Sequence, residues 1–149
     1  MTEVRFYHLN ASNAEKALPQ LLQKTLERDK RALVKLPDAE AVDRWNEHLW
    51  AYDDGAFLPH GSIKDEDPET QPIFLTHVDE NPARAEYLFL LGPADREDLE
   101  TFDMTAILFD GSDETTLGWA RSRWLSLKES ALERTYWQQN PAGRWAKKS

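Results

Sequence analysis

Several features that would point to a particular chemistry or compartment are missing from this sequence. The 149 residues contain no cysteine, which excludes disulfides, thiol catalysis and cysteine-ligated zinc. No apolar run approaches the roughly 18 residues that a membrane-spanning helix needs. The amino-terminal segment also lacks the apolar core of a signal peptide. We therefore expect a cytoplasmic protein that is not bound to a membrane.

The short motifs of common enzyme families are missing as well. No Gly-x-Gly-x-x-Gly follows the first predicted strand, and no Gly-Lys-Ser/Thr phosphate loop occurs, so the usual nucleotide-binding turns are absent. Gly-x-Ser-x-Gly and His-Glu-x-x-His are absent too. The four histidines are scattered, with no pair at the spacing of metal ligands. These motifs give no reason to expect a cofactor, a resident metal or an enzyme.

Charge is abundant but unevenly distributed along the chain. The formal net charge of −9 argues against direct binding of DNA, because affinity for phosphates depends on clustered Lys and Arg. The segment Thr115–Ser149 nevertheless carries seven Lys and Arg against two Glu. This asymmetry suggests a basic C-terminal element that faces an acidic ligand or partner. A solvated basic helix with a frayed Lys-Lys tail would explain the same pattern.

The order of strands and helices predicts the fold class. Strands are expected over Glu3–Leu9, Ala32–Leu36, Pro72–Thr76, Tyr87–Leu91 and, as the last strand, Met104–Phe109. Helices are expected over Ala14–Asp29, from the N-cap Asp38 to a stop at Asp53–Gly55, and from Ser112 or Asp113 to about Gln139. This alternation is typical of a mainly parallel sheet with helices on its faces. We predict one α/β domain over residues 1–149, with residues 139–149 as a C-terminal tail.

The final predicted helix carries the basic segment next to an apolar stripe. The stripe consists of residues at helical spacing, namely Leu117, Ala120, Trp124, Leu127 and Ala131. Arg121 lies three residues before Trp124, so the two side chains are expected to share a ridge beside the buried face.

A large aromatic surface is predicted around the end of the second helix. Trp50 lies near the end of this helix, Phe57 follows the Asp53–Gly55 turn, and Pro59 closes the extended segment that contains Phe57. Aromatic side chains of this kind either pack in a core or anchor a partner protein. The sequence pattern leaves both interpretations open.

An enzymatic interpretation depends on one turn. Asp110 and Asp113 flank a turn at the end of a predicted strand, a position where α/β sheets commonly bind ligands. The two carboxylates could hold a divalent metal in a small hydrolase or phosphotransferase. A plain turn followed by a helix N-cap explains the same residues.

A set of short motifs, in order along almost the whole chain, resembles one known family. The motifs are Phe6-Tyr7-His8-Leu9, Lys30-Arg31-Ala32-Leu33-Val34, Asp43-Arg44-Trp45, Leu49-Trp50, Phe57-Leu58-Pro59-His60, Pro72-Ile73 and Ala120-Arg121-Ser122-Arg123-Trp124. Together they resemble the chi subunit of bacterial DNA polymerase III, and Leu-Trp followed by Phe-Leu-Pro-His is the most specific part. One departure is Asp29, which stands where a glycine is common before Lys-Arg.

The resemblance implies a non-enzymatic adaptor with a Rossmann-like, three-layer sheet fold that binds no nucleotide. In that family, chi links the clamp-loader complex to single-stranded-DNA-binding protein (SSB). It grips the acidic C-terminal tail of SSB, which ends in Ile-Pro-Phe with a free carboxylate. Another surface of chi binds the psi subunit or a helicase-like repair protein.

The resemblance also implies roles for individual residues. Arg121 corresponds to the tail-binding arginine, and Trp124 stands where family members carry tyrosine, so it lines the notch or belongs to the core. Arg123 and Lys128 would attract the aspartates of the tail at long range. Trp50, Phe57 and Pro59 match the surface for psi or its competitor. A third possibility is a scaffold that keeps this partner surface and has lost tail binding.

Overall fold

The computed structural model describes residues 3–9, 14–51, 60–62, 67–91, 94, 96, 98–128, 130, 132–139 and 144–148. The strands are β1 (Glu3–Leu9), β2 (Ala32–Lys35), β3 (His60–Ser62), β4 (Ile73–Thr76), β5 (Tyr87–Leu91), β6 (Met104–Asp110), β7 (Glu133–Gln139) and β8 (Trp145–Lys147). The helices are α1 (Ala14–Glu27), α2 (Ala39–Ala51) and α3 (Glu114–Ser126), with short 3-10 turns at Pro68–Thr70 and Leu99–Thr101.

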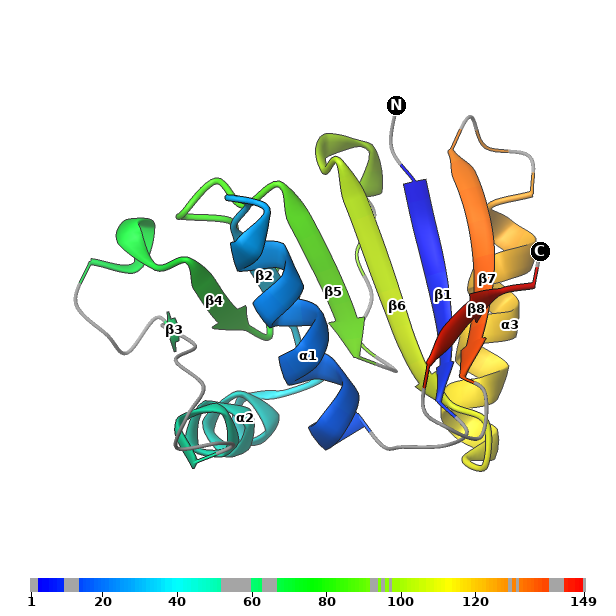
Figure 1. The fold of residues 1–149 in the computed structure, drawn as a ribbon, viewed down its shortest axis with the longest axis horizontal. Coiled ribbons are helices and arrows are strands. Elements are labelled where there is room, and N and C mark those ends of the chain that lie inside the picture. The colour runs from blue at the N-terminus through cyan, green and yellow to red at the C-terminus, as the bar shows by residue number, and fades with distance from the viewer. Residues whose placement is uncertain are drawn as a thin grey trace.

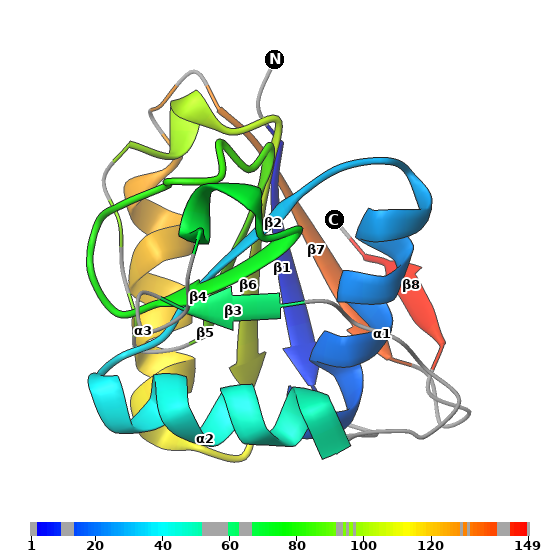
Figure 2. The ribbon, with the colours of Figure 1, turned by 90° about the vertical axis from the view of Figure 1, so that its left-hand side faces the viewer.

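In the part of the chain that the structure describes, the strands form one sheet in the order β3-β4-β2-β5-β6-β1-β7-β8. Neighbouring strands run parallel throughout except for β8, which pairs antiparallel with β7. Figures 1 and 2 show α1 on one face of this sheet and α3 on the other, with α2 crossing below the strands at the end to which the arrow of β1 points. The buried residues of α2 join the same core cluster as those of α1. The prediction of a mainly parallel, Rossmann-like α/β fold in three layers is confirmed.

The alternation of side chains along β1 explains why both faces of the sheet are covered. Val4 and Phe6 belong to the apolar cluster under α3. Tyr7 and Leu9 belong to the cluster under α1 and α2. Because successive side chains of a strand point to opposite faces, a strand that is apolar at nearly every position needs helices on both sides.

The last part of the chain differs from the prediction. α3 ends at Ser126, and residues 133–139, which we expected to finish this helix, form β7 instead. β7 pairs in parallel with β1, and its Thr135, Tyr136 and Trp137 are of the β-branched and aromatic types that favour strands. A strand is stabilised by its neighbour, so pairing with β1 decides the structure of this segment.

Two further strands were not predicted. The segment 145–147, expected as part of a tail, forms β8 at one edge of the sheet, so β6 is not the last strand. The three residues of β3 form the opposite edge. Both strands are too short for an alternating apolar pattern to be recognised in the sequence, and each is stabilised by pairing with a longer strand.

Predicted caps are present at the starts of two helices. The Asp38 carboxylate accepts a hydrogen bond from the Ala41 amide at 2.8 Å, and the Asp113 carboxylate accepts one from the Thr115 amide at 3.0 Å. Each carboxylate satisfies an amide that has no partner within its own helix. The stop predicted for α2 at Asp53–Gly55 lies outside the described residues.

The end of α1 explains the unusual Asp29. Its φ is 57°, in the left-handed region, and the Lys30 amide donates to the Thr25 carbonyl at 3.2 Å while the Asp29 amide donates to Leu26 at 3.0 Å. These two bonds form a Schellman motif, whose left-handed position is normally glycine. Asp tolerates this conformation better than most residues but less well than glycine.

We therefore predict that Asp29→Gly raises the free energy of unfolding by roughly 0.5 kcal/mol, because relief of the left-handed strain outweighs the added freedom of the unfolded chain. Asp29→Val should lower it by about 1–2 kcal/mol, because a β-branched residue resists this conformation. Urea titration of both variants measures the effect. A glycine variant less stable than wild type would show that the Asp29 side chain contributes more than its backbone costs.

Candidate functional site

A groove of about 760 Å³ lies between α3 and the adjoining strands β1, β6 and β7. Its lining residues come from four elements and one turn, namely His8, Phe109, Gly111, Leu117, Ala120, Arg121, Trp124, Leu125 and Tyr136. The lining is mainly apolar and aromatic, and among the described residues Arg121 is its one constitutively charged side chain. The structure thus brings Arg121 and Trp124 together in one groove, as their spacing predicted.

Trp124 is half-buried and serves both the core and the groove. Its ring packs edge-to-face on Phe6 in the core, with 5.1 Å between ring centroids, and against Tyr136 at 6.3 Å. The Arg134 guanidinium lies over the same ring, 4.1 Å from its centroid, and also donates to the Trp124 carbonyl. A ring held on several sides makes a rigid wall, so the two roles that the sequence left open for Trp124 coexist.

Arg121 is the exposed cation of the groove. It sits on α3 three residues before Trp124 and lines the groove together with it. Among the residues that the structure describes, its guanidinium makes no hydrogen bond or ion pair. A guanidinium beside an apolar wall can bind a carboxylate through two parallel hydrogen bonds.

The other two predicted cations lie outside this groove. Arg123 donates from Nη2 to the Arg96 carbonyl at 3.3 Å and lines a separate pocket near Leu99. Lys128 is exposed two residues beyond the end of α3 and is not part of the groove lining. Any effect of these two side chains on a ligand in the groove would therefore act over distance.

His8 and Tyr136 belong to the site although the sequence pattern did not predict them there. His8 Nδ1 and the Tyr136 hydroxyl share a short hydrogen bond, and Gln138 Nε2 donates to the same hydroxyl at 3.0 Å. The His8 ring also packs on Phe109, with centroids 4.9 Å apart. His8 lies on the same face of β1 as Phe6, because the two are separated by two residues of a strand, but its contact with Tyr136 depends on β7 lying beside β1.

The pKa of His8 is lowered from its ordinary value. Burial is the main cause, because it disfavours the charged imidazolium, and the positive charge of Arg121 acts in the same direction. The carboxylate of Asp110 opposes both. His8 is therefore neutral near pH 7 and leaves Arg121 as the positive charge of the groove.

This lowered pKa predicts a pH dependence of stability. As the pH falls, the unfolded chain protonates His8 before the folded chain does, so the stability due to neutral His8 is complete above about pH 6.5 and is lost below it. Between about pH 7 and pH 5, wild type should lose stability more steeply than His8→Asn, a variant that keeps a polar side chain near Tyr136. Urea titrations at several pH values test this, and equal slopes would contradict it.

Trp50 lies on a different surface. It sits near the end of α2, with 58% of its surface exposed, and its ring packs on His60 with centroids 4.2 Å apart. α2 contacts β3 and β4 at one edge of the sheet, whereas the groove lies at β1 and β7, toward the other edge (Figure 1). Core packing does not explain this exposed tryptophan. Phe57 and Pro59, predicted for the same surface, lie outside the described residues.

The two carboxylates of the enzymatic interpretation have local structural uses. Asp110 accepts hydrogen bonds from the Ser112 amide at 2.9 Å and hydroxyl at 2.7 Å, and these bonds lower its pKa. Asp113 caps α3. Within the described ranges, no group of three or more His, Asp or Glu side chains could hold a metal ion. These contacts favour the turn-and-cap explanation.

None of the described helices is both long enough and apolar enough to cross a lipid bilayer.

Comparisons with known proteins identify one family. Residues 1–135 match the family described as "DNA polymerase III chi subunit, HolC". The chain is also 26% identical, over 154 aligned residues, to a protein of Rickettsia prowazekii (strain Madrid E) named "Probable DNA polymerase III subunit chi". That alignment covers 99% of this chain and 92% of the relative.

Proposed function

Because the chain belongs to the DNA polymerase III chi subunit family, a family of accessory subunits in DNA replication, we propose that it is an adaptor for the SSB tail. In this proposal the α3 groove binds the acidic C-terminal tail of SSB and so links SSB to the clamp-loader complex. The observation that carries the proposal is an exposed arginine without a described partner beside a rigid aromatic wall.

The chemistry of the groove matches the end of such a tail. The terminal carboxylate would pair with Arg121, and the terminal phenylalanine would pack in the apolar space that Leu117, Trp124 and Tyr136 line. The neutral state of His8 at pH 7 favours an apolar group beside it. Arg123 and Lys128, which lie outside the groove, would act on the preceding aspartates by long-range attraction.

The Trp50 surface supports a second contact of the same adaptor. A tryptophan that is mostly exposed, on the side of the sheet away from the groove, is a typical anchor for a protein partner. We assign this surface, with Phe57 and Pro59, to the psi subunit or a helicase-like repair protein. The adaptor would work beside the replisome in the cytoplasm, without enzymatic activity of its own and without direct contact to DNA.

The proposal is tested by fluorescence anisotropy with a labelled peptide of the SSB tail, titrated with the full chain. We expect micromolar binding that weakens as salt is added, because a charged pair is screened by ions. A peptide whose terminal phenylalanine is replaced by alanine should bind at least about 10-fold more weakly, because it loses the buried ring. A well-folded protein that binds neither peptide would contradict the proposal and leave the Trp50 surface as the functional one.

A further inference from the structure

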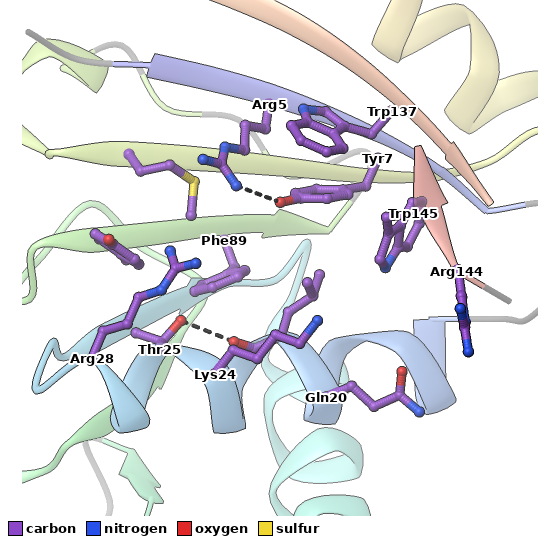
Figure 3. A pocket seen from close by; sticks show the side chains of 13 residues that line it. Arg5, Tyr7, Gln20, Lys24, Thr25, Arg28, Phe89, Trp137, Arg144 and Trp145 are labelled. Carbon is purple, nitrogen blue, oxygen red and sulfur yellow. Dashed lines mark hydrogen bonds between the residues drawn. The ribbon is translucent and has the colours of Figure 1, made fainter. Parts of the chain in front are cut away.

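A second pocket lies on the opposite face of the sheet, between α1 and the β7–β8 edge (Figure 3). Its volume is about 540 Å³, within the range of small-molecule sites. Side chains of β1, β5 and β6 form its floor, α1 forms one wall, and Trp137 and Trp145 form the other. The α3 groove and this pocket therefore share the strands β1, β6 and β7 but lie on opposite faces of the sheet.

The lining of this pocket is strongly basic. Four cationic side chains line it, namely Arg5, Lys24, Arg28 and Arg144, and no carboxylate does so among the described residues. They come from β1, α1 and the segment before β8. Arg5 forms an ion pair with the Glu3 carboxylate at 2.9 Å, so its charge is compensated within the protein. The helix dipole can account for cations near the end of α1, but it does not explain Arg144. In a chain with a net charge of −9, this concentration of positive charge indicates an anionic ligand.

The floor of the pocket carries a buried polar group. The Tyr7 hydroxyl accepts a hydrogen bond from Arg5 Nη1 at 3.3 Å, and the Tyr7 side chain is 4% exposed. Burial raises the pKa of Tyr7, while the charges of Arg5 and Arg28 lower it. The phenol therefore stays protonated and lies within the field of cations from two different elements.

Aromatic rings form the wall next to this phenol. Trp137 stacks with Tyr7 at 6.1 Å between centroids, and Trp145 meets Tyr7 edge-to-face at 4.8 Å. Arg5 also lies over the Trp137 ring, 5.2 Å from its centroid. Both tryptophans are partly exposed, so the pocket offers flat apolar surface beside its cations. Such a pairing suits a ligand with an anionic group and a planar ring.

We propose that this pocket binds a nucleoside phosphate. The phosphate would lie between Lys24, Arg28 and Arg144, and the base would lie against Trp145. A single carboxylate needs only one arginine, as in the α3 groove, whereas Lys24, Arg28 and Arg144 together suit the charge of nearly −2 on a phosphate monoester. The site lies toward the amino ends of β5 and β6, away from the strand ends where a glycine-rich phosphate loop would act. The absence of that loop therefore does not exclude it.

Isothermal titration calorimetry on the full chain tests this proposal. The probes are dTMP, thymidine, inorganic phosphate, and an eight-residue oligothymidylate with and without a 5′-phosphate. The double variant Lys24→Ala/Arg28→Ala removes two cations from the pocket. Its matched control, Arg44→Ala/Arg84→Ala, removes the same total charge from exposed positions outside both pockets. Circular dichroism confirms that both variants are folded.

We expect dTMP to bind at least about 10-fold more tightly than thymidine or inorganic phosphate, because only dTMP engages both cations and rings. The pocket variant should lose at least about 10-fold in affinity, and the control variant much less. Equal affinity for dTMP and the 5′-phosphorylated oligonucleotide would identify a free or terminal nucleotide as the ligand. Clearly tighter oligonucleotide binding would identify a DNA single strand and would overturn the absence of direct DNA contact proposed above. No binding of dTMP at millimolar concentration, or equal binding by the pocket variant, would overturn the proposal. The proposal would also be overturned if the SSB-tail peptide displaced dTMP and if binding of this peptide itself depended on Lys24 and Arg28.

Discussion

Arg121→Ala is expected to weaken binding of the SSB-tail peptide by about 30-fold, which corresponds to about 2 kcal/mol. The guanidinium is the exposed positive charge of the groove, and it lies beside the wall formed by Trp124. Its removal would leave the terminal carboxylate desolvated in a mainly apolar site. Anisotropy titrations at one salt concentration measure the loss. The side chain is exposed and holds no described partner, so thermal stability should stay near that of wild type.

Arg123→Ala is the matched control, since it removes the same charge from the same helix two residues away. Its guanidinium bonds to the Arg96 carbonyl and lines a different pocket. We expect at most a small loss of tail affinity, of about 0.5 kcal/mol, from the weaker long-range attraction. Equal losses in the two variants would mean that only the overall charge of α3 matters and that the groove does not position the carboxylate.

Gly111→Ala is expected to lower the free energy of unfolding by about 1–3 kcal/mol. A Cβ atom at this position would overlap the His8 ring, lying 2.8 Å from Cδ2 and 2.9 Å from Cε1. The ring cannot easily move away, because Tyr136 bonds to its Nδ1 and Phe109 packs on it. The substitution should also weaken tail binding, because His8 and Tyr136 line the groove.

Gly118→Ala provides a control for adding one methyl group nearby. Gly118 lies inside α3, and a Cβ atom there would meet nothing within 4 Å. Because alanine favours a helix over glycine by roughly 0.5–1 kcal/mol, this variant should melt a few degrees above wild type. If Gly111→Ala matched wild type in both melting temperature and affinity, the contact between His8 and Tyr136 would have no role in shaping the groove.

Much of the site on α3 could be predicted from sequence because it is local. A separation of three residues puts Arg121 and Trp124 on one ridge of a helix, and the structure places both in the groove. The same geometry also separates Arg121 from Arg123, because two residues correspond to slightly more than half a helical turn. The family resemblance assigned the tail carboxylate to Arg121 and only a long-range attraction to Arg123, and the helical spacing puts the two side chains on different faces.

The strand β7 could not be predicted because its cause is not local. Leu127 and Ala131 continue the spacing of the α3 stripe, so the pattern favoured one long helix up to Gln139. The segment forms a strand because β1 lies free to pair with it on the side away from β6. The contacts of His8 with Tyr136, and those of Tyr7 with Trp137 and Trp145, depend on this pairing.

The placement of β7 gives one strand a part in both candidate sites. Tyr136 lines the α3 groove, while its neighbour Trp137 lines the basic pocket on the other face. Alternate side chains of a strand point to opposite faces, so two adjacent residues can serve two ligands without contact between them. We therefore expect substitutions of Trp137 and Tyr136 to affect different ligands.

The pairing of Arg121 with the tail carboxylate is tested most directly by a double-mutant cycle. Wild type and Arg121→Ala are each titrated with the SSB-tail peptide in two forms, with a free C-terminal carboxylate and with a C-terminal amide. We predict that the amide costs wild type about 30-fold in affinity but costs Arg121→Ala little, a coupling of at least about 1.5 kcal/mol. Losses that simply add, with no coupling, would mean that the arginine and the carboxylate do not meet.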